Sequence, residues 1–360
     1  MTSITDHLFP FGIAAHAYNK DRSQVAVCLD TSDVHIYDTT SWTLLTKLTE
    51  HDELVTGIDW APETNRIVTC SQDRNAYVWT QEPNGTWKPT LVLLRINRAA
   101  THVRWSPRED KFAVASGARC VAICYFEEDN DWWVSKHLKK PIRSTVLCVD
   151  WHPNNVLLAV GGADMRAYVL SAYIKGVDSK PPPSPWGEKL PFNTICAEYV
   201  NPAGGWIHSV AFSPSGDALA FTGHDACITL AYPGTGAVTT IPTDRLPYLS
   251  MVWINEHRLV AAGHDCAPAY FEGQGDQWQF VKALDAKEVK KAANTNSAFN
   301  MFKQMDSRGI TSKNTAEGKT ELSTLHQNTI TMVRAFRRSS EGVSEFSTSG
   351  VDGRLVVWAV

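Results

Sequence analysis

The segment "VTGIDWAPETNRIVTCSQDRNAYVW", Val55 to Trp79, decides the fold of this chain. An alternating strand ends at Trp60, and the Ala-Pro pair that follows turns the chain. A second strand occupies residues 66–70, a tight turn contains Asp73, and a third strand completes the segment. The segment therefore predicts three short antiparallel strands joined by tight turns.

The same pattern occurs in seven copies, the first at Ile13 and the last at Ile330. Six copies place an Asp between the second and third strands, where a carboxylate can accept the hydrogen bonds that fix a turn. The third copy has Gly-Ala-Arg at residues 117–119 instead. A period of about 40 residues with four strands is typical of a β-propeller blade. The turn aspartates are Asp33, Asp73, Asp164, Asp225, Asp265 and Asp352.

The two ends of the chain complement each other. The final copy stops at "LVVWAV" after its third strand, while "TDHLFPFG" precedes the first copy without a partner. Pairing these segments closes the ring and removes an exposed sheet edge. We therefore expect residues 1–360 to form one all-β domain, a seven-bladed propeller. In the second copy, His51, Asp73 and Trp79 resemble the hydrogen-bonded network of a WD40 repeat.

Two intervals between turn aspartates exceed the period. Between the fourth and fifth copies the interval is 61 residues, and it contains the proline-rich stretch 178–192. We expect an extended loop over the surface near Trp186. Between the sixth and seventh copies the interval is 87 residues, and it contains residues 285–321. The polar flanks of this second insertion predict a flexible arm.

The arm contains "NTNSAFNMFKQMDSRG", whose spacing predicts an amphipathic helix at about 298–308. Ser297 can cap its start, and Gly309 stands where a helix usually ends. A helix of roughly 16 Å is marginal alone in water, so its apolar stripe needs a groove. We expect a partner's groove, and packing on its own propeller is the alternative. The stripe consists of Ala298, Phe299, Met301, Phe302 and Met305.

Composition narrows the class of protein. Hydrophobic residues make up 43% and charged residues 20%, as in ordinary soluble proteins. The net charge of −4 argues against a nucleic-acid binder, and no apolar run approaches the length of a membrane span. The N-terminus lacks a signal-peptide pattern. Eight Cys without a C-x-x-C pair favour reduced thiols in the cytosol.

Signatures of catalysis are absent or fail on inspection. The sequence "EGKT" at 317–320 lacks the upstream Gly of a phosphate loop. The pairs His224–Asp225 and His264–Asp265 occupy equivalent turns, so a structural role is favoured over a metal or catalytic one. Cys120 and Cys124 fit buried core thiols better than metal ligands. We expect no catalytic site, no cofactor and no metal, and no gathering of acidic or His residues at the channel mouth.

Basic residues cluster in the third and fourth copies. One interpretation is a solvated face with scattered ion pairs. Another is a positive rim that attracts an acidic protein segment. The neighbouring pair Trp132–Trp133 predicts one Trp packed inward and one available to a partner. The rim would consist of Arg95, Arg98, Lys136, Lys139, Lys140 and Arg143, with Arg104 and Arg108 in the same run.

Two longer phrases carry a specific resemblance. They are "LLRINRAATHVRWSPREDKFAV" at 93–114 and "CYFEEDNDWWVSKHLKKPIRSTVLCVDWHPNNVLLA" at 124–159. Together with the opening segment they resemble the WD40 subunits of the actin-related protein 2/3 complex, which nucleates branched actin filaments. The resemblance extends from about Ala15 to the C-terminus and is weakest in the polar arms.

This resemblance implies a non-catalytic scaffold that contacts the other subunits of the complex, including its two actin-related proteins. It also implies a role near the acidic tails of Wiskott–Aldrich-family activators, which would suit the basic rim. In that family the insertion between the last two blades is a protruding helix that contacts an actin-fold protein. Its matching positions here are Phe299, Phe302 and Met305. The implied location is the cytoplasm, at cortical actin structures.

Two other classes of function stay open. One is a generic WD40 adaptor for another complex, such as a ubiquitin ligase or a chromatin assembly. The other is an enzyme that uses the central channel of a propeller. The resemblance favours the actin-related assembly over both.

Overall fold

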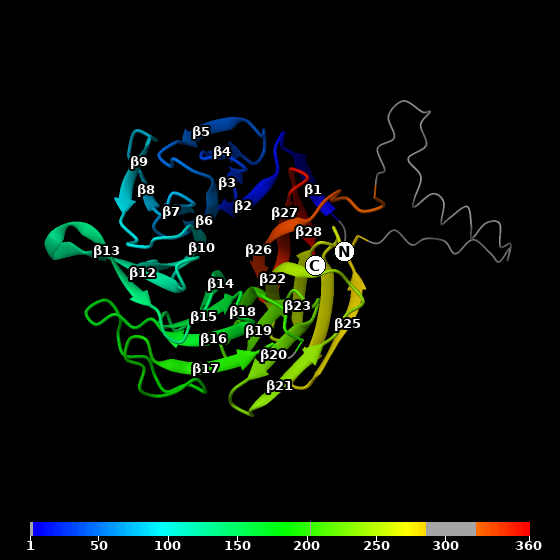
Figure 1. Ribbon diagram of the computed structural model, residues 1–360. Coiled ribbons are helices and arrows are strands. Elements are labelled where there is room, and N and C mark those ends of the chain that lie inside the picture. The colour runs from blue at the N-terminus through cyan, green and yellow to red at the C-terminus, as the bar shows by residue number, and fades with distance from the viewer. Residues whose placement is uncertain (1–2, 202, 286–321) are drawn as a thin grey trace.

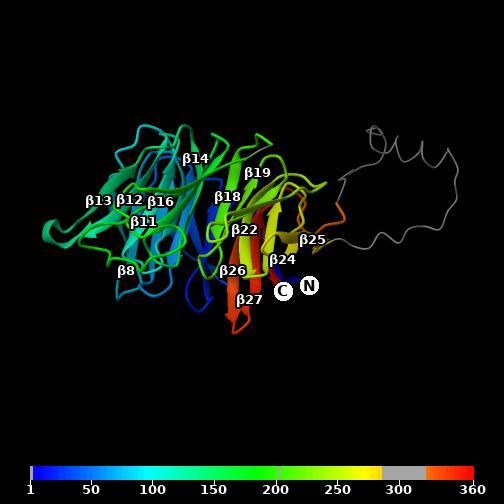
Figure 2. The same ribbon diagram turned by 90° about the horizontal axis from the view of Figure 1, so that it is seen from below.

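Twenty-eight short strands form seven four-stranded antiparallel sheets in this computed structural model, which describes residues 3–201, 203–285 and 322–360. The sheets stand side by side around a common axis, like the blades of a propeller (Figure 1). Seen from the side, inner strands such as β18 (Ile207–Phe212) and β22 (Tyr248–Asn255) run roughly along that axis (Figure 2). The predicted all-β, seven-bladed WD40 propeller is therefore confirmed.

Blades 1 to 4 each follow the sequence order, and the first strand of each lies innermost. Blade 1 contains β2 (Ile13–Tyr18), β3 (Gln24–Leu29), β4 (Val34–Asp38) and β5 (Leu44–Leu48). Blade 2 contains β6 (Val55–Ala61), β7 (Arg66–Ser71), β8 (Ala76–Gln81) and β9 (Trp87–Val92). Blade 3 contains β10 (Ala100–Trp105), β11 (Lys111–Ser116), β12 (Cys120–Glu127), a short 3-10 helix η1 (Glu128–Asn130) and β13 (Trp132–Leu138). Blade 4 contains β14 (Val146–Trp151), β15 (Leu157–Gly162), β16 (Arg166–Ser171) and β17 (Ile195–Val200).

Blades 5 and 6 repeat this order, and blade 7 combines both ends of the chain. Blade 5 contains β18 (Ile207–Phe212), β19 (Leu219–Gly223), β20 (Ile228–Tyr232) and β21 (Ala237–Ile241). Blade 6 contains β22 (Tyr248–Asn255), β23 (Arg258–Gly263), β24 (Ala269–Gln274) and β25 (Gln277–Ala283). Blade 7 contains β26 (Ile330–Ser339), β27 (Gly342–Gly350), β28 (Arg354–Ala359) and β1 (Ser3–Leu8).

The ring closes where the N-terminal strand joins the last blade. Strand β1 pairs antiparallel with β28, with Asp6 opposite Val356. Beyond the pairing, the backbone N–H of Phe9 donates to the carbonyl of Gly353 at 2.8 Å. The predicted closure is confirmed, and it removes the edge that β28 would otherwise expose.

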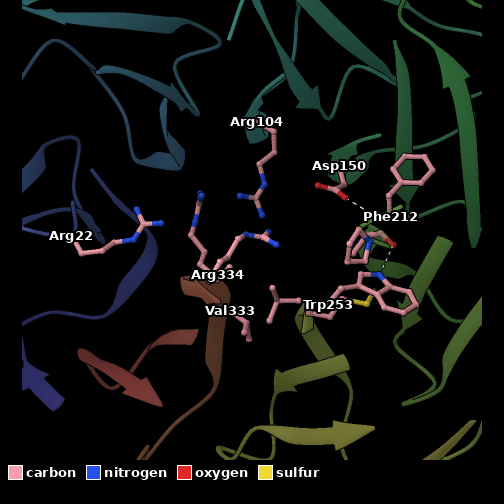
Figure 3. A pocket seen from close by; sticks show the side chains of 13 residues that line it. Arg22, Arg104, Asp150, Phe212, Trp253, Val333 and Arg334 are labelled. Atoms are coloured by element: carbon pink, nitrogen blue, oxygen red, sulfur yellow. Dashed lines mark hydrogen bonds between the residues drawn. The ribbon is translucent and has the colours of Figure 1, made fainter. Parts of the chain in front are cut away.

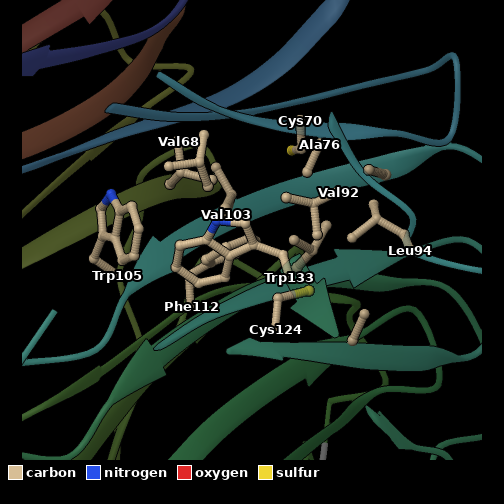
Figure 4. Packing of buried hydrophobic residues seen from close by; sticks show 14 of the residues in the cluster. Val68, Cys70, Ala76, Val92, Leu94, Val103, Trp105, Phe112, Cys124 and Trp133 are labelled. Atoms are coloured by element: carbon tan, nitrogen blue, oxygen red, sulfur yellow. The ribbon is translucent and has the colours of Figure 1, made fainter. Parts of the chain in front are cut away.

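The hydrophobic core is a ring of clusters rather than a single centre. Each of seven apolar clusters among the described residues joins two adjacent blades. Between blades 2 and 3, for example, Trp105, Phe112 and Trp133 pack edge to face (Figure 4). Trp133 is 8% exposed and Trp132 is 57% exposed, as the sequence predicted for that pair.

The antiparallel order gives the ring two distinct faces. One carries the connections between blades and the turns between second and third strands, and we call it the connection face. The other carries the remaining turns, and we call it the opposite face. All predicted turn aspartates lie in second-to-third turns and therefore on the connection face.

The proline-rich insertion is anchored more deeply than predicted. Trp186 is 4% exposed, and its indole N–H donates to the carbonyl of Gly216 at 2.7 Å. Asp178 at the start of the insertion forms a buried ion pair with Lys111 of blade 3. The loop therefore crosses the surface by inserting side chains into it. The predicted arm at 285–321, with its helix at about 298–308, lies outside the described residues from 286 onward.

Candidate functional site

The sequence proposed two contact regions, and the structure describes one of them. The helical stripe of Phe299, Met301, Phe302 and Met305 lies outside the described residues. The basic rim lies on blade 3 and its two connections, which the structure describes in full.

The rim residues occupy neighbouring segments of the connection face. Arg95 and Arg98 lie between β9 and β10, and Lys139, Lys140 and Arg143 lie between β13 and β14. These side chains are exposed. Within the part of the chain that the structure describes, none of them forms an ion pair. The absence of such pairs argues against the interpretation of the rim as a face of scattered salt bridges.

A depression of 470 Å³ gathers part of the rim. Arg95 and Lys139 line it, together with Arg119, which the sequence analysis missed. Ile96 and Ile142 add apolar surface between these cations. The sequence feature that could have indicated Arg119 is the Gly-Ala-Arg of the third copy, which stands where the other six copies have the turn Asp. The depression can accept an acidic segment that also carries an apolar side chain.

The other basic residues of this run lie outside the 470 Å³ depression. The ammonium of Lys136, on β13, lies 4.1 Å from the ring centre of Phe192. The backbone N–H of Arg143 donates to Asp164 at 3.0 Å, so this residue also has a role in the turn of blade 4. Arg104 does not belong to the rim, because it points into the central channel (Figure 3). Arg108 donates to Ser179 Oγ on the opposite face.

Blade 2 contains a chain of four hydrogen-bonded side chains. Trp79 Nε1–H donates to Thr69 Oγ1 at 3.0 Å, and Thr69 lies 2.8 Å from His51 Nε2. His51 Nδ1 lies 2.7 Å from the Asp73 carboxylate. Because Asp73 accepts, Nδ1 carries the proton and Nε2 accepts from Thr69. Burial lowers the pKa of His51 below its ordinary value, and the hydrogen bond to Asp73 opposes that shift.

Blade 7 contains the same hydrogen-bonded network as blade 2. Of its members, the sequence had indicated only Asp352. His326 Nδ1 lies 3.1 Å from Asp352, and its Nε2 lies 2.8 Å from Thr348 Oγ1. Trp358 Nε1–H donates to the same hydroxyl at 2.8 Å. The pKa of Asp352 is lowered although burial would raise it, because hydrogen bonds from His326 and from two backbone N–H groups outweigh burial. Thr348, Asp352 and Trp358 have the same spacing as Thr69, Asp73 and Trp79, so a search for that spacing would have found them, whereas His326 lies 22 residues before its Thr and His51 only 18.

Asp164, Asp225 and Asp265 accept backbone or amide hydrogen bonds without a histidine network. Among the described residues, the carboxylate of Asp33 accepts only from the hydroxyl of Ser32, at 3.5 Å. Asp265 accepts from the N–H of Leu246, and Asp225 accepts from the amide of Asn201, both at 3.0 Å. His224 contacts His208 rather than its neighbouring aspartate. The hydrogen bonds to Asp225 and Asp265 stabilise their turns, which is the role that the sequence favoured for these residues.

One equivalent position from every blade forms a layer around the channel. The fifth residue of each innermost strand forms a layer of four charged and three apolar residues. In order around the ring, the layer consists of Ala17, Asp59, Arg104, Asp150, Ala211, Val252 and Arg334. Arg334 donates to Asp59 at 2.6 Å, and Arg104 lies 3.8 Å from the same carboxylate. Sequence reasoning missed this layer.

The channel also corrects one expectation. His102, Asp150 and His208 line a single cavity of 190 Å³, so acidic and His side chains do gather there. Burial and the charge of Arg104 lower the pKa of His102, while burial and His224 lower that of His208 to about 4. Burial raises the pKa of Asp150 to about 6. Among the described residues, His, Cys, Asp and Glu form no group of three suited to a metal ion.

Comparison with known proteins extends this description. A model of the WD domain, G-beta repeat family matches residues 42–80 and 128–170. Actin-related protein 2/3 complex subunit 1 of Schizosaccharomyces pombe is 47% identical over 382 aligned residues that include all of both chains. Subunit 1A-B of that complex in Xenopus laevis is 50% identical over 96% of this chain and 93% of its own. Subunit 1 of Saccharomyces cerevisiae is 40% identical, over 97% and 94%. Among the described residues, no helix is long and apolar enough to cross a membrane.

Proposed function

The chain belongs to the family of actin-related protein 2/3 complex subunit 1, and we propose that it is a non-catalytic scaffold subunit of that complex. The observation that carries this proposal is identity of 40–50% with the relatives named above along nearly the whole of both chains. Such identity covers all seven blades rather than the repeat pattern alone. The proposed location is the cytoplasmic actin cytoskeleton, and the proposed unit is one propeller domain over residues 1–360.

The scaffold role rests on a rigid ring with many exposed turns. Seven interlocked clusters fix the relative positions of the blades, so the turns on each face keep their spacing when partners bind. Neighbouring subunits held by these turns would present a preformed end to actin monomers. The chain itself would supply position and no chemical step.

Affinity purification of the tagged chain from its own cells tests membership of the complex. We expect actin-related proteins 2 and 3 in the eluate, in amounts comparable with the tagged chain. Repeated recovery of ubiquitin-ligase or chromatin components without either actin-related protein would contradict the proposal.

We propose that the inserted segment contacts the actin filament through its apolar stripe. The support is the sequence spacing of Phe299, Phe302 and Met305, together with the position of the insertion between blades 6 and 7. The variant Phe299→Ala with Phe302→Ala should reduce filament attachment or branch formation by the assembled complex. The matched control is Asn300→Ala with Gln304→Ala, which changes the opposite side of the predicted helix. Equal branching by both variants and the unchanged complex would remove this contact from the account.

We propose that the basic rim binds an acidic segment of a Wiskott–Aldrich-family activator. The supporting features are the exposed cations around the 470 Å³ depression and the apolar Ile96 and Ile142 between them. Charge reversal by Arg95→Glu with Lys139→Glu should weaken binding of an acidic activator peptide about tenfold or more, about 1.4 kcal/mol. The attraction should also weaken as salt is raised.

The control for this test is Lys88→Glu, which makes the same kind of charge change at an exposed site on β9. Lys88 lies toward the opposite face, so peptide affinity should change less than about twofold, a factor worth about 0.4 kcal/mol. Equal losses in the rim variant and the control would indicate a nonspecific effect of net charge and would contradict a defined site.

A further inference from the structure

The opposite face holds a second concentration of positive charge, separate from the rim. A cavity of 340 Å³ opens at this end of the channel and is lined by Arg22, Arg104, Arg334 and Arg338. Figure 3 shows the side chains of Arg22, Arg104 and Arg334 directed toward one space, with Asp150 beside Arg104 and across from Arg22. Four guanidinium groups in one small cavity require a physical explanation, because like charges repel.

These arginines come from three different blades. Arg104 and Arg334 occupy the channel layer on the innermost strands of blades 3 and 7, and their side chains are 26% and 11% exposed. Arg338 lies nearer the end of β26. Arg22 lies in the β2–β3 turn with a φ of 67°, where it donates to the carbonyls of Asn19 and Phe336, both at 2.5 Å. The fold therefore holds Arg22 in place by backbone hydrogen bonds rather than by an acidic partner.

The nearby carboxylates do not balance this charge. Asp59 accepts from Arg334 and lies near Arg104, while Asp150 accepts from the backbone N–H of Phe212 at 2.9 Å. With both carboxylates ionised, the four arginines leave a surplus of two positive charges. Within the described ranges, Arg22 and Arg338 have no carboxylate within 4.0 Å.

One buried hydrogen-bond donor of the cavity also has no acceptor among the described residues. Arg104 Nε is buried, and no described residue provides an acceptor for it. Burial and the charge of Arg104 lower the pKa of Arg334 to about 10, and burial with the charge of Arg338 lowers that of Arg22. Buried donors without acceptors and cations without counter-charge both cost free energy, and a bound anion would relieve both.

We propose that this cavity binds a small, soluble, phosphate-bearing anion. Guanidinium groups match the oxygens of a phosphoryl group in pairs, and a phosphoryl dianion matches the surplus of two charges. The apolar side of the channel layer, formed by Ala211 and Val252, leaves room beside the arginines for an organic portion. The two arginines of the layer lie inside the ring, which favours a soluble anion over a headgroup held in a bilayer.

Titration calorimetry on the full chain with inorganic pyrophosphate, at constant ionic strength, tests this proposal. We expect saturable binding with one site per chain. The informative variant is Arg338→Gln, because Arg338 is exposed and has no ion pair among the described residues that its loss would break. It should weaken pyrophosphate binding tenfold or more.

The matched control is Arg337→Gln, the adjacent position on β26, which pairs with Glu345 and does not line the cavity. It should change the affinity by less than twofold. Equal weakening by the two variants, or no binding of pyrophosphate to the unchanged chain, would overturn the proposal. Succinate binding as tight as pyrophosphate binding would overturn the phosphate assignment. Capture of the chain by vesicles that contain a phosphorylated inositol lipid, without binding of pyrophosphate, would overturn the proposal that the anion is soluble.

Discussion

Blades 2 and 3 are neighbours with the same strand order, yet they are stabilised differently at equivalent positions. Val55 and Ala100 begin the two inner strands and pair with Ser71 and Ser116, so equivalent residues differ by 45 in number. The hydrogen-bonded side chains of blade 2 are His51, Thr69, Asp73 and Trp79. Their counterparts in blade 3 are Ile96, Val114, Ala118 and Cys124.

All four side chains of the blade 2 network are different in blade 3, so no member of the network remains there without its partners. Removing one partner of a buried hydrogen bond leaves the other unsatisfied, whereas replacing all partners with apolar groups can be nearly neutral. Val114 and Cys124 are fully buried in the cluster that contains Trp105, Phe112 and Trp133 (Figure 4). Blade 3 has therefore replaced a polar network with apolar packing as a unit.

The same exchange affects the surface. Ile96 and Ala118, which stand in place of His51 and Asp73, line the depression that Arg95, Arg119 and Lys139 surround. A blade without the turn network thus presents apolar surface and cations at the position where blade 2 presents a closed, hydrogen-bonded turn. This difference is a second line of support for the rim as a contact surface.

The largest effect should follow from breaking the apolar packing of blade 3. Phe112→Ala removes a fully buried ring that packs on both Trp105 and Trp133. We expect a loss of about 3–5 kcal/mol in the free energy of unfolding, measured by urea denaturation. Phe126→Ala is the control, since Phe126 is 37% exposed and contacts only the edge of this group. Similar losses in both variants would contradict the role assigned to the cluster.

Single changes in the network of blade 2 should have the next largest effect. Asp73→Ala deprives His51 and the N–H of Asn75 of their acceptor, at an expected cost of about 1–3 kcal/mol. Asp33→Ala in blade 1 should stay within about 0.5 kcal/mol, because the structure gives Asp33 no such network.

The combined variant sharpens this result. His51→Ile, Thr69→Val and Asp73→Ala give blade 2 the residues of blade 3, and Trp79→Phe removes the indole N–H while keeping an aromatic ring at that position. Since the four residues act in one network, the total loss should be smaller than the sum of the four single losses by at least about 0.5 kcal/mol. Strict additivity in urea denaturation would mean that the residues do not act as a unit.

The reverse change should destabilise blade 3. Val114→Thr places a hydroxyl at the position of Thr69 but without His or Trp partners, so we expect a loss of about 1–3 kcal/mol. Val114→Ala provides the comparison for loss of volume alone. Unchanged stability of the Thr variant would show that blade 3 can satisfy a buried hydroxyl.

The smallest effect concerns pH. The folded-state pKa of His51 lies below its unfolded value, so its contribution to stability is complete above about pH 6.5 and decreases as the pH falls toward the folded value. The blade-3-like variant lacks this histidine and should lose less stability between pH 7 and pH 5. The difference should not exceed about 1.4 kcal/mol per pH unit. Equal pH slopes in urea denaturation would exclude His51 as a contributor.

The sequence predicted the ring well because the evidence for it is periodic. Counting copies of the repeat gave seven blades, and the unmatched ends gave the pairing of β1 with β28. The network of blade 2 was indicated by the spacing of His51, Asp73 and Trp79, but Thr69 was not, because a hydroxyl in a strand carries no distinctive pattern.

The channel could not be predicted in the same way. Asp59, Arg104, Asp150 and Arg334 are far apart in sequence, and they meet only because each is the fifth residue of an innermost strand. That register depends on strand boundaries, which the period alone does not fix. Arg104 was therefore grouped with the run of basic residues that contains the rim, although it points into the channel.

Branch counting by fluorescence microscopy tests the central proposal most directly. Actin-related protein 2/3 complexes would be assembled with and without this chain and supplied with activator, actin and a mother filament. We expect few branches without the chain and restoration of branching when the purified chain is added back. Equal numbers of branches with and without the chain would contradict its role as a scaffold subunit of the complex.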